Sequence, residues 1–191
     1  MNSNHDKVCP TPEWAAYLQN EVLPALVDGV TLGERMLEVG PGPGAATDWL
    51  RQRVGELVAL EIDPESAARL QERFGAGNVE VHVGDATAIP WSDGSFDSVG
   101  CFTMLHHVPT VQLQNRVLAE AHRVLTPEGT LVGSDSLPSD DLHRFHEGDT
   151  YNPIDPASLF ARLQTIGFDW ITITADERLS FRARKPPTAA A

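Results

Sequence analysis

Three glycines stand at alternate positions in MLEVGPGPGAAT, residues 36–47, between an apolar run and a segment with helical spacing. Gly40, Gly42 and Gly44 have no Cβ, so the backbone can approach a ligand closely, and the intervening prolines restrict the φ angles between them. The helix that follows would offer unpaired N–H groups and the positive end of its dipole. The loop is therefore expected to bind an anionic group such as a carboxylate.

A carboxylate, Glu61, ends the next apolar run, about 20 residues after Gly40, which is the usual place for a ribose-binding acid. It can accept hydrogen bonds from both hydroxyls of a ribose, a group that nicotinamide dinucleotides and S-adenosylmethionine share. Asp63 competes for this role, but its position before Pro64 favours helix capping. These features predict a nucleoside ligand without identifying it.

The stretch GDATAIPWSDGSFDSV, residues 84–99, separates the two candidates. Asp85 ends a third apolar run and is followed by the small Ala86 and by the apolar Ile89 and Trp91. The acid can accept the exocyclic amine of an adenine while the backbone at Ala86 reads the edge of the ring. An adenosyl group is therefore the expected ligand.

Strands and helices must alternate to position these residues. The periodicity predicts strands over 35–40, 56–62, 79–85, 95–105 and 129–136, and helices over 45–54, 64–74, 111–125 and 155–168, after a leading helix that begins near Thr11. Such alternation requires a parallel sheet with right-handed crossovers. The last strands, 169–175 and 179–185, are separated only by DER and should form an antiparallel hairpin. The predicted fold is α/β, a doubly wound, mainly parallel sheet with a C-terminal antiparallel hairpin.

Over residues 34–175 the chain resembles class I S-adenosylmethionine-dependent methyltransferases. The resemblance rests on the glycine loop, the two acids and three further segments, FDSVGCFTMLHHV, EAHRVLTPEGTLVGSDS and LQTIGF. It implies S-adenosyl-L-methionine as cofactor and S-adenosyl-L-homocysteine as product. One departure is PEGT, where relatives commonly have two glycines and where Glu128 is expected to be an exposed variation. The cofactor-binding residues that the resemblance implies are Glu38, Gly40, Gly42, Gly44, Glu61, Ile62, Asp85, Ala86 and Thr103.

Methyl transfer is an in-line displacement, in which positioning alone can contribute roughly 7 to 11 kcal/mol. A general base adds about 10² to 10⁴ in rate and matters mainly when the acceptor is an alcohol. His106, in MLHHVP, is the base candidate, because some methyltransferases of small hydroxylated or amine substrates resemble it there. A role in packing is equally open. His107, a candidate for substrate binding, would point the other way if the strand continued.

Residues 134–156, SDSLPSDDLHRFHEGDTYNPIDP, are expected to form a substrate lid. His143 and His146 are three apart, so they share a face if the segment is helical, and they are further catalytic candidates. The lid either binds a polyol with a second base, forms a divalent metal site, or is a polar surface loop. A metal such as Mg²⁺ is possible but not predicted; its ligands would be His143, His146, Glu147 and Asp149. The substrate-binding candidates are Trp14 and Tyr17 of the leading helix, His107, Asp149 and Tyr151.

Acidic residues outnumber basic ones, 27 Asp and Glu against 14 Lys and Arg, which gives a formal net charge of −13. Most of the surface would repel a phosphate backbone, so no nucleic-acid partner is expected. The last basic cluster predicts a solvated strand at the edge of the sheet. Its members are Arg178, Arg182, Arg184 and Lys185.

A chain of 191 residues favours one domain, predicted over 1–185, with a cap helix within 1–30 and a disordered tail over 186–191. Cys9 and Cys101 are too few for a disulfide framework or a cysteine zinc site. No apolar run has the length of a signal peptide core or a membrane span. A cytoplasmic monomer or homodimer with no membrane partner is therefore expected.

The lid has many hydrogen-bonding groups and few aromatic ones, which favours O-methylation of a small, non-aromatic polar molecule, a sugar being one form. N-methylation of a small amine is the alternative within the class. A nicotinamide-dependent oxidoreductase would need a Tyr-x-x-x-Lys pair, which the sequence lacks. A non-catalytic module that binds S-adenosylmethionine is the third alternative, against which the intact glycines and acids argue.

Overall fold

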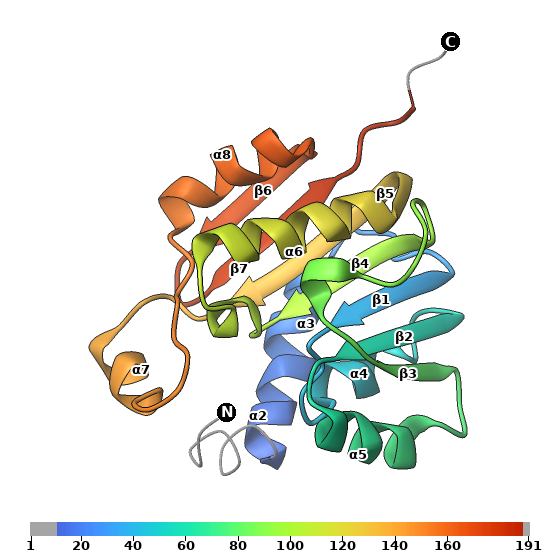
Figure 1. Ribbon diagram of the computed structural model, residues 1–191, viewed down its shortest axis with the longest axis horizontal. Helices are drawn as coiled ribbons and strands as arrows, with labels where there is room; N and C mark the ends of the chain where they lie inside the picture. The colour runs from blue at the N-terminus through green and yellow to red at the C-terminus, as the bar shows by residue number, and fades with distance from the viewer. Residues whose placement is uncertain (1–10, 189–191) are drawn as a thin grey trace.

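The computed structural model describes residues 11–188, which form one seven-stranded sheet between two layers of helices (Figure 1). The strands run in the order β3-β2-β1-β4-β5-β7-β6 across the sheet. Their bounds are β1 (Arg35–Val39), β2 (Glu56–Glu61), β3 (Val79–Val83), β4 (Phe96–Phe102), β5 (Leu125–Asp135), β6 (Asp169–Ala175) and β7 (Leu179–Arg184).

The helices pack on both faces of the sheet, as the alternating sequence predicts. One buried cluster joins α6 and α8 to the sheet, and a second joins α3, α4 and α5 to the other face. The helical segments are α2 (Pro12–Tyr17), the π-helical η1 (Leu18–Val22), α3 (Leu23–Val27), α4 (Ala45–Leu50), α5 (Pro64–Phe74), the 3-10 turns η2 (Ala86–Ala88) and η3 (Leu105–His107), α6 (Val111–Val124), α7 (Asp140–Phe145) and α8 (Pro156–Ile166).

The first five strands are parallel, and β7 pairs in antiparallel fashion with both β5 and β6. The predicted fold class and the terminal hairpin are confirmed. Strand order reverses between β1 and β4, and in open α/β sheets ligands bind outside the carboxyl ends of the strands at this position. The glycine loop leaves β1 at this point.

The prediction of a solvated edge strand at the end of the chain is wrong. The hairpin folds back so that β7 lies between β5 and β6, and β6 becomes the edge. Two of the basic side chains are consequently bound to backbone carbonyls: Arg182 Nη1 donates to Asp28 at 2.7 Å and Lys185 Nζ to Leu125 at 2.7 Å.

Several boundaries differ from the sequence prediction. The helix expected over 45–54 ends at Leu50, because the chain then turns toward β2. The strand expected over 95–105 ends at Phe102, and a 3-10 turn follows. Thr11 caps α2 through its hydroxyl, as predicted. Cys9, the rest of residues 1–10, and 189–191 of the expected tail lie outside the described residues.

Across residues 11–188, no helix combines the length and apolar character needed to span a membrane.

Candidate active site

The three glycines of the loop after β1 all have left-handed backbone conformations, with φ of 63°, 56° and 82° at Gly40, Gly42 and Gly44. A Cβ on Gly40 would lie 2.9 Å from Cβ of Met104, and one on Gly44 would lie 2.7 Å from the ring of Phe74. A Cβ on Gly42 would meet nothing within 4 Å. Gly40 and Gly44 are therefore required by packing, whereas Gly42 borders open space in which a ligand could lie.

Glu61 lies at the end of β2 and holds this loop in place. Its Oε2 accepts from the backbone N–H of Gly42 at 3.1 Å, and its Oε1 accepts from that of Asp63 at 3.1 Å. Each oxygen keeps a second lone pair that could accept from a ribose hydroxyl. Asp63 instead caps α5, where its carboxylate accepts from Ser66 N–H at 3.0 Å, so the capping prediction is confirmed.

An apolar surface lies beside Glu61. Ile62 is 68% exposed, and Val83, which is paired in register with Glu61, is 57% exposed. Asp85 lies just after the end of β3 and is exposed. Its Oδ1 accepts from Thr87 N–H at 2.8 Å and so caps η2. Exposed apolar side chains next to an acid suit the face and amine of an adenine. Sequence reasoning missed Val83, although an apolar residue at the carboxyl end of a strand, beside the ribose acid, was a signal.

Glu38 of β1 lies buried on the first strand, at 1% exposure. Burial raises the pKa of its carboxyl to about 7, a rise that the hydrogen bond from the Thr47 hydroxyl opposes and the charge of Glu61 reinforces. The hydroxyl oxygen lies 2.6 Å from Glu38 Oε2. Glu38 can therefore be neutral or ionised near neutral pH, and a cationic ligand nearby would favour the ionised form.

The histidine pair after β4 is folded differently from the sequence expectation. Because the strand ends at Phe102 and Leu105–His107 form a 3-10 turn, His107 does not point away from His106. Their ring centroids are 4.1 Å apart. The expectation that His107 points the other way applied only if the strand continued, and that condition is not met.

His106 is paired with a carboxylate that the sequence analysis did not single out as its partner. Its Nδ1 lies 2.6 Å from Oδ1 of Asp135, at the end of β5, and both side chains are buried. The Asp135 carboxylate also accepts from the His106 backbone N–H at 3.3 Å. A carboxylate oxygen accepts hydrogen bonds, so Nδ1 of His106 is the donor to Asp135, and Nε2 is the ring nitrogen that remains for another partner.

The lid brings a third imidazole to this pair. His146, the C-cap of α7, is buried, and its ring centroid lies 4.9 Å from that of His106 and 5.3 Å from that of His107. Tyr151 stacks on it at 4.3 Å. Burial, together with the charge of His106, lowers the pKa of His146, despite its hydrogen bond to Leu142.

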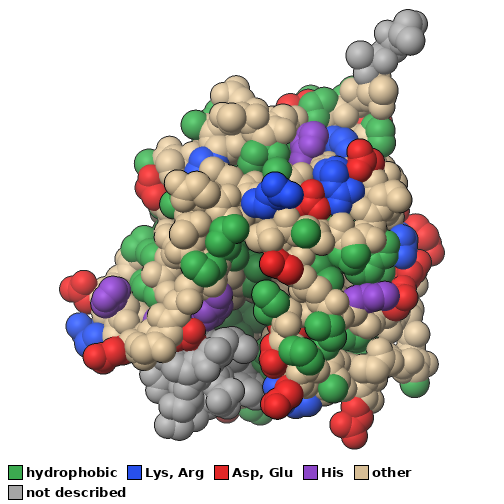
Figure 2. All heavy atoms as spheres, viewed as in Figure 1, with side chains coloured by type: hydrophobic (Ala, Val, Ile, Leu, Met, Phe, Trp, Pro, Cys, Tyr) green, Lys and Arg blue, Asp and Glu red, His purple; other side chains and the backbone are tan. Residues whose placement is uncertain are grey.

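The rest of the lid stays nearer the surface. His143 on α7 is exposed, 6.0 Å from the Tyr151 ring, and borders a cavity of about 360 Å³ whose lining includes His146, Glu147 and Asp149. Figure 2 shows a hollowed surface beside the strand ends, with histidine and hydrophobic side chains along it. Within residues 11–188, one group of side chains has ligand atoms close enough together to hold a metal ion: His106, His107 and His146. Only His146 also belongs to the ligand set that the sequence suggested for a metal.

The leading helix reaches the same edge of the sheet. Arg178, just before β7, lies 5.5 Å from the ring of Trp14 and 5.9 Å from that of Tyr17, and its Nη2 donates to Thr103 Oγ1 at 3.3 Å. Thr103 has a φ of 56°, a rare conformation for this residue type. The sequence treated Arg178 as part of a solvated strand and so missed its place beside Thr103.

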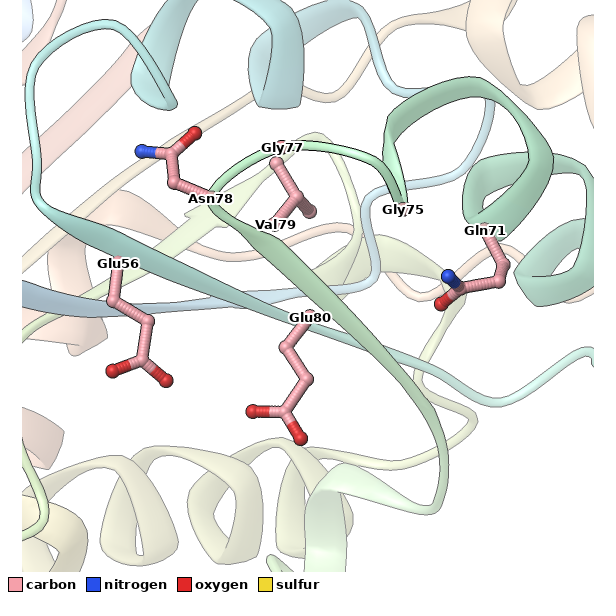
Figure 3. A pocket seen from close by; sticks show the side chains of 7 residues that line it. All are labelled: Glu56, Gln71, Gly75, Gly77, Asn78, Val79 and Glu80. Carbon is pink, nitrogen blue, oxygen red and sulfur yellow. The ribbon is translucent and has the colours of Figure 1, made fainter.

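A second cavity, of about 320 Å³, lies at the starts of β2 and β3, away from the edge that carries the glycine loop (Figure 3). It is lined by Glu56, Gln71, Gly75, Gly77, Asn78, Val79 and Glu80. Asn78 uses its amide to bind the carbonyls of Arg51 and Val54, which is a structural role. This cavity holds no group of residues suited to catalysis.

A family profile described as a methyltransferase domain matches residues 37–133, about half of the chain. The chain belongs to this methyltransferase family. The match runs from within β1 to within β5 and includes the glycine loop, both acids and His106.

Individual relatives match shorter stretches. The ribosomal RNA small subunit methyltransferase A of Aromatoleum aromaticum is 48% identical over 54 residues, 28% of this chain and 20% of that protein. The ubiquinone/menaquinone biosynthesis C-methyltransferase of Methylobacterium nodulans is 33% identical over 120 residues, 60% of this chain and 46% of that protein. The chain thus spans between a fifth and a half of the length of these relatives.

The solved structure of the trans-methyltransferase CalH in complex with SAH has a TM-score of 0.70 and 23% identity, covering 91% of this chain and 57% of that chain. The predicted family and class I fold are confirmed, and the matched profile describes a methyltransferase domain, in agreement with the predicted enzyme class. The SAH of the CalH structure is bound to that protein. The identity of the methyl acceptor is a separate question.

Proposed function

We propose that this chain transfers a methyl group from S-adenosyl-L-methionine to a hydroxyl of a small, non-aromatic polar molecule. The observation that carries the proposal is the buried His106–Asp135 pair, at the ends of β4 and β5 and beside the glycine loop of β1. Such a pair is what an alcohol acceptor requires, because a hydroxyl must lose its proton as it is methylated.

The cofactor fits the residues at this edge. Gly42 borders open space, Glu61 keeps lone pairs for the ribose, and Ile62 and Val83 offer an apolar face for the adenine. Asp85 and the backbone of Ala86 would bind the edge of the adenine, and Glu38 and Thr103 would lie toward the methionine part. When bound, the cofactor supplies a methyl group activated by a positively charged sulfur.

The chain's own contribution is to position and deprotonate the acceptor. Nε2 of His106 would accept the hydroxyl proton, and the negative charge of Asp135 would stabilise the imidazolium that forms. The hydrogen bond to Asp135 holds the buried ring in one tautomer. The polar side chains of the lid, Asp149 and Tyr151 among them, would bind the other hydroxyls of the acceptor.

Other acceptors are less well supported. The relatives include a ribosomal RNA methyltransferase, but the net charge of −13 opposes a phosphate backbone. A small amine is the second candidate, because His106 could also take a proton from an ammonium group. We accordingly propose a small-molecule acceptor, handled by a cytoplasmic monomer or homodimer.

The test is a panel of sugars, other polyols, amines and a ribosomal RNA fragment, assayed by release of S-adenosylhomocysteine. We expect turnover with at least one polyol and none with the RNA. Methylation of the RNA, or of amines alone, would contradict the proposed acceptor class. His106→Ala should abolish the turnover, with His82→Ala, on β3 and outside the site, as the matched control.

A further inference from the structure

Three imidazoles from two separate parts of the chain come together at this site. His106, His107 and His146 each offer a ring nitrogen, and these atoms all lie within 4.8 Å of one another. We propose that they bind a divalent transition-metal ion, with Zn²⁺ as the ion to test. The proposal concerns a site that the family's methyl-transfer chemistry does not require.

Two of the three rings are already fixed in the tautomer that a metal needs. Nδ1 of His106 lies 2.6 Å from the Asp135 carboxylate, and Nδ1 of His146 lies 2.7 Å from the carbonyl of Leu142. Both partners accept hydrogen bonds, so both Nδ1 atoms carry the proton and Nε2 is the ligand atom. Such outer partners orient metal-binding histidines and make them better ligands.

The spacing requires only a small closure. Zinc binds imidazole nitrogen at about 2.0–2.1 Å, so tetrahedral ligand atoms are about 3.4 Å apart. The ring nitrogens that now lie within 4.8 Å of one another would therefore draw together by at most about 1.4 Å. His146 lies in the lid, directly after α7, and can approach by a small shift of that segment, while His106 and His107 stay in the 3-10 turn η3 that follows β4.

The ligand set selects the ion. Imidazole suits zinc, cobalt, nickel, copper and iron, whereas Mg²⁺ and Ca²⁺ prefer oxygen ligands. Three protein ligands also leave a fourth position for a water or a substrate oxygen, as in catalytic zinc sites. The Mg²⁺ considered from sequence is therefore the wrong kind of ion for this group.

The metal site would extend the proposed function. It rests on that function in one respect, which is that the acceptor hydroxyl binds next to His106. With the ion bound, Nε2 of His106 is a ligand and no longer accepts a proton. The hydroxyl bound to the ion would have a lowered pKa, and its proton would leave to water. Asp135 keeps the same task, which is to hold the tautomer of His106.

The experiment measures metal binding directly, on the full-length protein after dialysis against a chelator. Zn²⁺ is titrated by calorimetry and Co²⁺ by its visible absorption, whose intensity reports tetrahedral coordination. We expect one equivalent to bind, and His146→Ala to lose it. Asp135→Asn should weaken binding by about 10- to 100-fold. His82→Ala is the matched control and should bind as the native protein does.

Circular dichroism confirms that each variant is folded before it is titrated. No saturable binding, or equal binding to His82→Ala and to the His107→Ala/His146→Ala double variant, would overturn the site. Turnover that persists in the chelated protein would also remove the metal from the reaction while leaving the proposed function intact. Stoichiometric metal binding without turnover on any acceptor would confirm the metal site and contradict the proposed function.

Discussion

His106 and Asp135 are 29 residues apart in the chain, yet Nδ1 of the imidazole lies 2.6 Å from Oδ1 of the carboxylate. The sheet brings them together: β4 and β5 are parallel neighbours, and Phe102 is paired in register with Ser134. The chain after each of these residues leaves the same edge of the sheet. The pair is thus fixed by strand register, which a rigid core maintains.

Asp135→Asn should lower kcat by about 10² to 10⁴, the usual contribution of a general base. The amide lacks the charge that stabilises an imidazolium, and it can turn its NH₂ group toward Nδ1 and so reverse the tautomer. The KM for S-adenosylmethionine should stay within about twofold, since Asp135 is not in the cradle. The measurement is S-adenosylhomocysteine release, with Asp93→Asn on the surface as control. A native rate in Asp135→Asn would exclude the pair from catalysis.

Stability should depend on pH through Glu38. Burial raises its folded pKa to about 7, above the unfolded value of 4.5, so its contribution is full below about pH 4.5 and is lost as pH rises to about 7. The loss is of the order of 3 kcal/mol at most. In urea denaturation from pH 5 to 8, Glu38→Gln should remove this decline, and Glu56→Gln should keep it. Parallel profiles for native protein and Glu38→Gln would show that the carboxyl does not titrate there.

Cofactor affinity should also follow Glu38. The ionised carboxylate attracts a cation, so S-adenosylmethionine should bind more tightly as pH rises through about 7 and should release a proton on binding. Calorimetry in buffers of different ionisation enthalpy measures that proton. S-adenosylhomocysteine, which lacks the positive sulfur, should show a weaker dependence. Equal proton release for both ligands would point to their shared ammonium group or to another residue.

Gly42 and Gly44 should respond differently to alanine. Both substitutions strain a left-handed backbone by about 1–2 kcal/mol. Only Gly44→Ala adds a collision, with Phe74 and Leu70, so it should lower the Tm more. Gly42→Ala should instead weaken S-adenosylmethionine binding by about tenfold or more, which corresponds to about 1.4 kcal/mol. The reverse ranking in either measurement would contradict the assignment of Gly42 to the ligand.

Arg178→Gln should loosen the leading helix from the sheet. The guanidinium contacts the rings of Trp14 and Tyr17, and each exposed contact of this kind is worth about 0.5–1 kcal/mol. Chymotrypsin should therefore cleave after these aromatic residues faster than in the native protein. Arg69→Gln, on the exposed surface of α5, is the control. Unchanged cleavage would mean that other contacts of α2 hold the helix in place.

The sequence predicts well what depends on local pattern. Alternating periods and caps such as Asp63 identify most helices and strands, and the glycine spacing identifies the cradle. Exact boundaries were harder: the end of β4 at Phe102 decides where His107 points, and no local signal marks it. Asp135 and His146 were noted as lid residues, but their contact with His106 depends on strand register and on how the lid folds back. Arg178 was misjudged because the place of β7 inside the sheet is a tertiary property.

The interior position of β7 has a consequence for how the protein is made. Residues 179–184 follow the other six strands of this sheet in the chain, so until they are synthesised β5 presents an unpaired edge and β6 has no partner in the sheet. An open edge of this kind is a template for pairing with other chains. Folding during synthesis therefore cannot be completed before the hairpin emerges, and truncation within it should yield aggregation rather than a smaller stable protein.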